Sequence, residues 1–487
     1  MRQSMTKIRT PLLIAALAAA FSVTLAGCTV GPDYLRPQFD TPSSWRIDYP
    51  QATELTNLQW WTQFQDPVLN QLIETALREN QDIRIAAARV DQFLGQLQTT
   101  RSQFFPQIGY GLDVSRNRTS ERNYSSLGGK DPWYRLYQGT ISADWQLDLF
   151  GRVRRQSEAA QAQVYASEQG RRGTLLTVVS GVASGYISLR SLDRQLEIAR
   201  ATSDNYAGTL GLFQLRFKGG VVSQVELSQV ESQYQQAKTA VTRLEQQIAA
   251  QENLLSVLLG QAPGPIPRGR KIEQLALPVV PPGLPSSLIE RRPDVLQAEH
   301  NLVAANASIG VARSLYFPTL SLTGMLGSLS TAAADFMSGP AKIATIAANV
   351  SGPIFTFGNI EGQVRSAEAS EREAMANYQQ TILNAFRDTN DALVGTQKST
   401  EALSSEQARL KSLREYARLS RLRFEEGVAS YLDVLYADNE LFSAELSTVI
   451  ASSDRLIQLI GVYRALGGGW VDEADALTTT SDKPGQG

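Results

Sequence analysis

The chain offers few side chains that could carry out chemistry. Its 487 residues include one cysteine, Cys28, and one histidine, His300. No cysteine, aspartate or glutamate set stands at metal-ligand spacing around His300, which falls in a predicted helix and is expected to be a packed or surface side chain. The motifs GxSxG, HExxH and the P-loop do not occur. We therefore expect no enzymatic activity, no metal site and no cofactor.

Cys28 has a different chemical role. It follows a basic start and an apolar run, "LLIAALAAAFSVTLA", that ends in the small residues Ala26 and Gly27. This pattern is typical of a secretory signal peptide and predicts one at residues 1–27. The stretch "LAGC" resembles the bacterial lipobox, so Cys28 is predicted to carry acyl chains, palmitate among them, that anchor the mature chain in a membrane. Thr29 in the next position favours the outer membrane.

Composition limits how this chain can meet a membrane. The net charge of −2 argues against a nucleic-acid partner, and the mean hydropathy is −0.20. After residue 27 we find no run of the ~18 apolar residues that a spanning helix needs. If the chain crosses a membrane, it must do so as β-strands, which bond their backbone groups to one another.

The sequence repeats itself at an offset of 207 to 212 residues. "LRFKGGVVS" at 215–223 returns as "LRFEEGVAS" at 422–430, and "SQFFP" at 102–106 returns as "SLYFP" at 314–318. A tandem duplication explains this order and spacing. The predicted organisation is a lipidated N-terminal arm, a first repeat, a proline-rich linker, a second repeat and a flexible tail, at residues 28–68, 69–265, 266–287, 288–470 and 471–487.

Each repeat contains two segments with a period of two. Ile108, Tyr110, Leu112 and Val114 alternate with glycine, aspartate and serine, and residues 137–148 alternate in the same way. Strands with one apolar and one polar face, each about ten residues long, are typical of transmembrane β-barrels and of soluble sandwich edges. Both interpretations stay open on the strands alone. The strands are predicted at about 107–116, 136–148, 318–327 and 343–355.

Long helices follow the strands. Apolar residues recur every three or four positions over 152–218 and 223–258, and again over 359–424 and 430–466. This spacing predicts coiled-coil packing, and the short turns between the members of each pair predict antiparallel hairpins. A soluble coiled-coil dimer would show the same helices. Because four strands per chain cannot close a barrel, a spanning form requires an oligomer, with eight strands from two chains or twelve from three.

Five motifs in order resemble the outer-membrane efflux channels of the TolC/OprM type, in their lipoprotein branch. They are "CTVGPDYLRP", "WWTQFQDPVLNQLI", "RRPDV", "FFP" with "YFP", and the paired "LRFxxGVxS" turns. The resemblance covers almost all of the mature chain. It implies a mixed membrane protein: a homotrimer with a shared twelve-stranded transmembrane β-barrel, a long periplasmic α-helical barrel and a mixed equatorial domain.

The same resemblance implies a function. Such channels passively carry drugs or other small toxic compounds outward from a periplasmic adaptor and an inner-membrane pump of the resistance-nodulation-division class. Multidrug resistance follows from that activity. Two alternatives stay open: the same fold serving type I protein secretion, and a lipid-tethered periplasmic coiled-coil scaffold that does not span the membrane.

The resemblance also implies a periplasmic gate at the helical turns. Its acidic position falls on Asp433, with Glu226 as the counterpart in the first repeat, and Phe424 matches an aromatic residue that helps to close the tip. Leu432 would add an apolar constriction. Tyr436 stands where relatives often place a second acid, so this gate is expected to close more by aromatic packing. The turns themselves, which could contact the adaptor, contain Gly219, Gly220, Ser223, Gly427 and Ser430.

Overall fold

The computed structural model describes residues 29–39, 59–120, 133–278 and 291–467. The signal peptide, Cys28 and the predicted tail at 471–487 lie outside the described residues. The chain divides into two compact units. The first comprises Met1–Pro37, Val90–Ala166 and Ala298–Tyr378; the second comprises Gln38–Arg89, Ser167–Gln297 and Gln379–Gly487.

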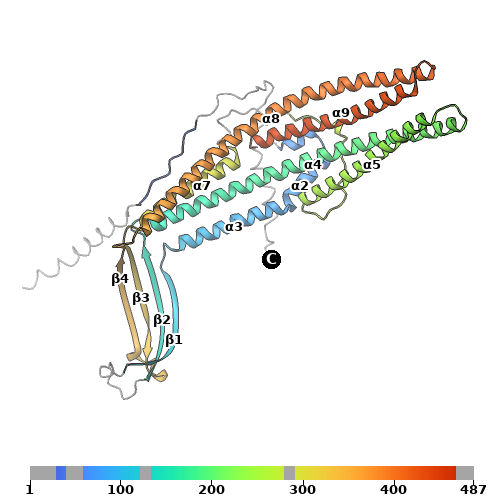
Figure 1. Ribbon diagram of the computed structural model, residues 1–487. Helices are drawn as coiled ribbons and strands as arrows, with labels where there is room; N and C mark the ends of the chain where they lie inside the picture. The colour runs from blue at the N-terminus through green and yellow to red at the C-terminus, as the bar shows by residue number, and fades with distance from the viewer. Residues whose placement is uncertain (1–28, 40–58, 121–132, 279–290, 468–487) are drawn as a thin grey trace, which may run out of the picture. The chain divides into compact units, whose positions relative to one another are not determined.

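The first unit contains an antiparallel sheet whose strand order follows the chain (Figure 1). Its strands in the described residues are β1 (Gln107–Arg118), β2 (Trp133–Leu147), β3 (Thr319–Ser330) and β4 (Lys342–Ser351). The central pairing of β2 with β3 joins the two repeats, so each repeat supplies two adjacent strands. The expected span 343–355 was too long, since β4 ends at Ser351, just before Gly352 and Pro353. Proline has no N–H to donate to a strand partner.

Helices join this sheet at a single end. Helix α3 (Gln81–Ser102) leads into β1 and α7 (Pro293–Ser314) leads into β3, whereas α4 (Arg152–Lys218) follows β2 and α8 (Asn359–Glu425) follows β4. Because neighbouring strands are antiparallel, these four connections all lie at the same end of the strands. The β1–β2 and β3–β4 connections lie at the opposite end of the strands.

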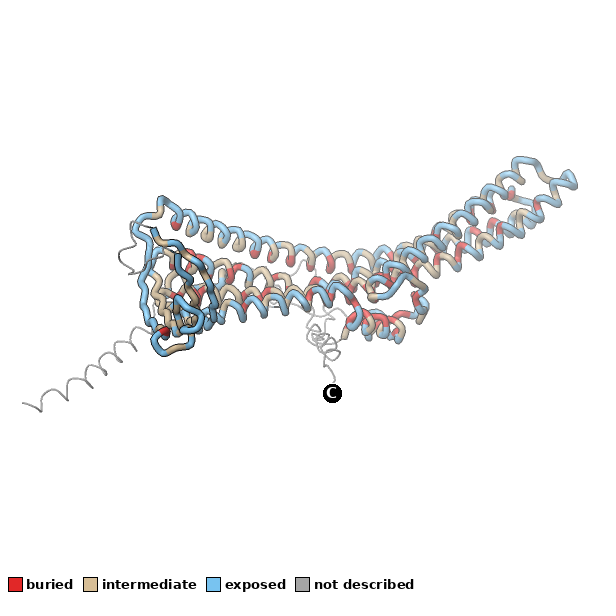
Figure 2. Tube along the Cα trace, turned by 90° about the horizontal axis from the view of Figure 1, so that it is seen from below, coloured by how far each residue is buried: buried red, intermediate tan, exposed pale blue. Residues whose placement is uncertain are grey.

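In the second unit, the later part of α4 pairs with α5 (Gln224–Leu258), and the later part of α8 pairs with α9 (Tyr431–Ala465). The observed bounds lie within one residue of the expected helices. Ion pairs tie each hairpin together, such as Arg200 with Glu245 at 2.7 Å and Arg409 with Glu440 at 3.3 Å. Buried positions recur along the long helices with exposed ones between them, as amphipathic packing requires (Figure 2).

Helix α4 departs from the hydropathy expectation. It contains an 18-residue window of mean hydropathy 1.3, which by length and composition could cross a membrane. However, 72% of that window is buried inside the protein. Burial of that extent is typical of a core helix, and the apolar side chains of α4 serve the packing described next.

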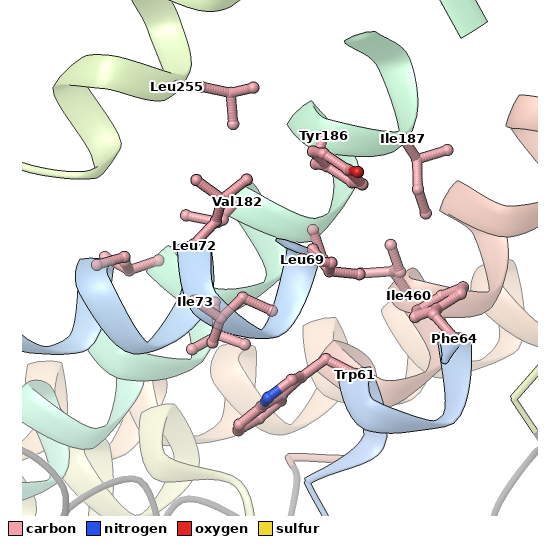
Figure 3. Packing of buried hydrophobic residues seen from close by; sticks show 14 of the residues in the cluster. Trp61, Phe64, Leu69, Leu72, Ile73, Val182, Tyr186, Ile187, Leu255 and Ile460 are labelled. Atoms are coloured by element: carbon pink, nitrogen blue, oxygen red, sulfur yellow. The ribbon is translucent and has the colours of Figure 1, made fainter. Parts of the chain in front are cut away.

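The main hydrophobic core belongs to the second unit (Figure 3). Trp61 and Phe64 of η1 (Trp60–Phe64) pack with side chains of α2 (Pro67–Glu79), α4, α5 and α9. Trp60 stacks on Tyr463 of α9 at a centroid distance of 5.1 Å. The stretch from Trp60 to Val68, expected in the N-terminal arm, therefore contributes to the core.

Two further local features complete the described fold. The first repeat begins with two helices, α2 and α3, because Asn80 ends the first and caps the second, accepting hydrogen bonds from Asp82 N at 2.8 Å and Ile83 N at 3.1 Å. The described part of the linker comprises residues 266–278. It forms the short helix η3 (Ile272–Gln274) and buries Ile266 and Ile272 in the core.

Candidate functional site: the two-faced sheet and the helical tips

The strand register places most of the apolar residues of the four strands on one face. Tyr110 pairs with Ile141, Ile141 with Leu326, and Leu326 with Ala344. The residues aligned with them on this apolar face are Ile108, Leu112, Val114, Tyr137, Ala143, Trp145, Leu147, Leu320, Leu322, Ile346, Ala348 and Val350. Several are largely exposed, with Tyr110 at 85% and Ile346 at 95%. Tyr137 to Leu147 spans about 33 Å of strand, or about 25 Å at a barrel tilt of ~40°, the height of a lipid-facing band.

The opposite face is largely polar or small. Asp113 pairs with Gln138, and Asp144 pairs with Thr323 and accepts a hydrogen bond from its hydroxyl at 2.8 Å. Its other polar or small members include Gly109, Gly111, Ser115, Thr140, Ser142, Gln146, Thr319, Ser321, Thr345, Asn349 and Ser351. The apolar residues Leu136, Met325, Leu329 and Ile343 also align with this face. A sheet with one apolar and one polar face can separate lipid from water.

The sheet has two open edges in the single chain. Within the described residues, β1 pairs only with β2, and β4 pairs only with β3. The outer N–H and C=O groups of β1 and β4 therefore have no strand partner there. Unpaired backbone groups cost several kcal/mol each in hydrocarbon, so this sheet is incomplete as a membrane-spanning element.

The turns of the two helical hairpins have the same geometry. Gly220 and Gly427 adopt φ of 75° and 73°, the left-handed conformation that favours glycine. Val221 N donates to Arg216 O at 2.9 Å, and Val428 N donates to Arg423 O at 2.9 Å. These bonds are those of helix C-terminal caps, so both glycines stop a helix.

The two predicted gate acids cap the helices that follow. Ser223 N donates to the Glu226 carboxylate at 2.7 Å, and Ser430 N donates to the Asp433 carboxylate at 3.2 Å. The hydrogen bond from Ser223 lowers the pKa of Glu226 below its ordinary value. Both acids thus satisfy a helix N-terminus, while Asp433 remains on the exposed surface.

The remaining predicted gate residues divide into two groups. Phe424 packs edge-on against the buried Tyr431 at 5.0 Å, and Tyr431 contacts Phe213 at 4.4 Å, so Phe424 belongs to the packing inside the tip. In contrast, Leu432 is 49% exposed and Tyr436 is 61% exposed. Helical spacing puts Leu432 and Tyr436 on one face of α9, beside Asp433.

An ion pair near the tips was missed by sequence reasoning. Arg421 of α8 contacts Asp438 of α9 at 3.0 Å, and burial raises the pKa of Asp438. Its only sequence signal is the opposite charge at matching distances on either side of the α8–α9 turn. This pair holds the second hairpin together close to the exposed face of α9.

The N-terminal arm, which follows Cys28, is held within the first unit. Arg155 of α4 is buried; its guanidinium donates to Val30 O at 3.3 Å and Gly31 O at 3.4 Å and pairs with Asp33 at 2.6 Å. Gly31 passes close to Gly310 of α7, where a Cβ on Gly31 would lie 2.4 Å from the Gly310 Cα. Further along, Arg36 pairs with Glu299 at 2.9 Å.

Nothing in the described part of the chain resembles a metal centre, since no group of three or more histidine, cysteine or acidic side chains could hold an ion there. His300 lies in α7 and its ring contacts that of Tyr165 at 5.3 Å. This agrees with the expectation of a packed histidine.

Comparison with known proteins identifies the family. The family described as Outer membrane efflux protein matches residues 72–261 and again 284–468. The chain belongs to the outer membrane efflux protein family. The double match confirms the tandem repeat, with one copy on each side of the linker.

Relatives of known name cover almost the whole chain. The toluene efflux pump outer membrane protein TtgF of Pseudomonas putida is 32% identical over 469 residues, which are 93% of this chain and 96% of TtgF. The probable outer membrane lipoprotein SilC of Salmonella typhimurium is 30% identical over 454 residues, 92% of this chain and 97% of SilC. The cation efflux system protein CusC of Escherichia coli is 30% identical over 456 residues, 92% of this chain and 97% of CusC.

A solved structure of CusC, described in connection with transmembrane channel formation, matches with a TM-score of 0.80. The match covers 91% of this chain and 100% of that one at 29% identity. The expected TolC-like fold, outer-membrane location and role in efflux are therefore confirmed for this outer membrane efflux protein. Its family is one of passive channels.

Proposed function

We propose that three copies of this chain form one closed barrel of twelve strands in the outer membrane. The observation that supports this is the two-faced sheet, whose β1 and β4 edges have no strand partner in the described residues. Three copies would join β1 of one chain to β4 of the next and pair every edge. The apolar face carrying Ile141 would meet lipid, and the polar face carrying Ser142 would line a water-filled channel.

In this assembly the protein serves as the exit channel of a tripartite efflux system. A periplasmic adaptor and an inner-membrane pump deliver small toxic compounds, and the channel conducts them outward without a chemical step. TtgF is named for toluene efflux and CusC for cation efflux, so the family spans apolar and ionic cargoes. We propose drugs or other small toxic compounds as the cargo.

Acylation of Cys28, by palmitate among other chains, would add a second hold on the membrane. The arm contacts of Arg155 support this role, since they fix the chain from Val30 onward, two residues after the cysteine. SilC is named a probable outer membrane lipoprotein. Cleavage after residue 27 and lipid attachment would then place the anchor beside the first unit.

The helical tips form the periplasmic gate and the adaptor contact in this proposal. Asp433, Leu432 and Tyr436 form the exposed face of α9 that would line the constriction, with Glu226 as the counterpart on α5. Phe424 would act from inside the tip, by supporting Tyr431. The capped turns, which include Gly219, Gly220, Ser223, Gly427 and Ser430, present a regular end for the adaptor.

A direct test combines mass and conductance. Native mass spectrometry of the detergent-purified protein should give the mass of three acylated chains, and planar bilayers should show ion conductance. A monomer that leaves bilayers sealed would overturn the channel and favour the lipid-tethered scaffold. Deletion of the gene should increase susceptibility to toxic compounds. Loss of a secreted protein with unchanged susceptibility would favour type I secretion.

A further inference from the structure

At one end of the strands, the apolar face of the sheet is bounded by basic side chains. Arg116 and Arg118 follow Val114 on β1, Arg135 precedes Tyr137 on β2, and Lys342 begins β4. The register aligns these positions with the apolar face, since Arg116 pairs with Arg135 and Ser328 pairs with Lys342. We refer to Arg116, Arg118, Arg135 and Lys342 as the basic rim.

The basic rim occurs at only one end of that face. At the strand ends that join the helices, the last residues on the apolar face are uncharged: Ile108, Leu147, Leu320 and Val350. The basic rim lies at the opposite end of the strands, where the β1–β2 and β3–β4 connections leave the sheet. In an outer membrane efflux protein the helices extend into the periplasm, so the rim lies at the outer leaflet.

The arrangement of the rim is unfavourable for a free protein surface. Arg116 and Arg135 are directly opposite each other on antiparallel strands, and like charges in such positions repel. Arg116 also lies over the Trp133 ring at 5.0 Å, a contact that holds its guanidinium on this face. Across the parts of the chain that the structure describes, no carboxylate forms an ion pair with Arg116, Arg135 or Lys342. The described acid nearest to these residues in sequence is Asp113, which the register places on the opposite face of the sheet.

We propose that the basic rim binds the phosphate groups of an anionic lipid in the outer leaflet. A phosphate between Arg116 and Arg135 would accept hydrogen bonds from both guanidinium groups and remove their repulsion. Its acyl chains would lie along the apolar face below, over side chains such as Leu112 and Ile141. Trp133, on the same face at this level, suits the interface between headgroups and hydrocarbon. The proposal rests on the membrane orientation of the sheet given above.

The test uses the intact channel in phosphatidylcholine vesicles with and without lipid A, a glycolipid with two phosphates. Lipid A should raise the thermal stability of the wild type. Its apparent affinity should fall roughly 25-fold in the double variant Arg116→Gln/Arg135→Gln, because each Arg charge contributes about a factor of five. Lys342→Gln should give a smaller loss. The matched control is Arg365→Gln/Arg372→Gln, which removes the same charge from the exposed surface of α8 and should bind lipid A like the wild type.

Three outcomes would overturn the proposal. The first is equal affinity of the wild type and the Arg116→Gln/Arg135→Gln variant for lipid A. The second is an equal effect from lipid A without its phosphates, and the third is an equal effect from inorganic phosphate alone. Conductance is measured on the same samples. A conducting channel that ignores lipid A would refute only the lipid site, whereas a protein that fails to conduct would refute the proposed function.

Discussion

The hydroxyl of Tyr186 donates a hydrogen bond to the carboxylate of Asp66 at 2.9 Å, with both side chains fully buried. Asp66 caps α2 by accepting from Val68 N at 2.9 Å, and its second oxygen also accepts from Arg270 N at 2.9 Å. Gly269 N in turn donates to the Tyr186 oxygen at 2.8 Å. These bonds join α2, α4 and the linker between the repeats in the core of the second unit. Tyr186 is labelled among the core residues in Figure 3.

Tyr186→Phe should destabilise the second unit. The change removes one donor to Asp66 and the acceptor of Gly269 N, and buried polar groups without partners cost about 1–3 kcal/mol each. Chemical denaturation followed by tryptophan fluorescence measures the loss, because Trp60 and Trp61 lie in the same core. Tyr416→Phe, on an exposed tyrosine, is the control and should be nearly silent. Equal midpoints for the two variants would contradict this account of the network.

The network also shows where sequence reasoning stops. The long helices could be predicted to within a residue because apolar spacing and the Gly220 and Gly427 turns are local signals. The contact of Asp66 with Tyr186 joins residues 120 positions apart, and no local pattern contains it. Similarly, the alternation in β1 and β2 predicted two faces, but only the register places Arg116 opposite Arg135.

In the candidate site, too, local sequence predicts some features and tertiary packing decides the others. Asp433 and Glu226 could be located from the repeated turn, since each lies six residues after its glycine. That Phe424 packs inside the tip and that Leu432 is exposed depends on how α8 meets α9, which the repeat does not encode. The end of β4 was placed too far along because its alanine-rich sequence alternates weakly.

The first turn of α5 should loosen in acid. The hydrogen bond from Ser223 N lowers the pKa of Glu226 below 4.5 in the folded protein, so its stabilisation is fully present above pH 4.5 and is lost as the pH falls through the lowered pKa. Amide exchange over residues 224–227, corrected for intrinsic rates, should therefore rise below pH 4.5. Glu226→Gln keeps a neutral acceptor and should abolish this rise. A rise of the same size in Glu226→Gln would assign it to another group.

Arg155→Met should release the N-terminal arm. The guanidinium is buried and bonds to two backbone carbonyls, so its loss should cost the docked arm about 2 kcal/mol. Asp33→Ala is the paired variant: Asp33 is 89% exposed, and exposed ion pairs contribute below about 1 kcal/mol. Limited proteolysis within residues 29–37 should be much faster in Arg155→Met than in Asp33→Ala. Equal cleavage would show that the ion pair, and not the backbone contacts, holds the arm.

The two faces of the sheet can be told apart with neighbouring residues on β2. Ile141→Lys puts a charge on the apolar face, which at the bilayer midplane costs about 2–4 kcal/mol per chain, and should reduce membrane assembly. Ser142→Lys puts the same charge on the polar face and should assemble normally while shifting conductance toward anions. Heat-modifiable migration in detergent gels and bilayer recordings give the two readouts. Normal assembly of Ile141→Lys together with failure of Ser142→Lys would invert the assignment of the faces.

Asp433 should set the ion preference of the closed tip. In the proposed trimer three Asp433 carboxylates surround one pore, where they would attract cations and bind divalent ions. Asp433→Asn retains an oxygen that can accept from Ser430 N, so the helix start should persist while three charges disappear. The reversal potential across a salt gradient should then move toward zero, which indicates a loss of cation selectivity. Block of the current by divalent ions should also weaken. Ser430→Ala removes a cap hydroxyl without changing charge and should keep the wild-type selectivity. If Asp433→Asn also kept it, the carboxylate would be only a helix cap, and the exposed Leu432 and Tyr436 would be left to form the constriction.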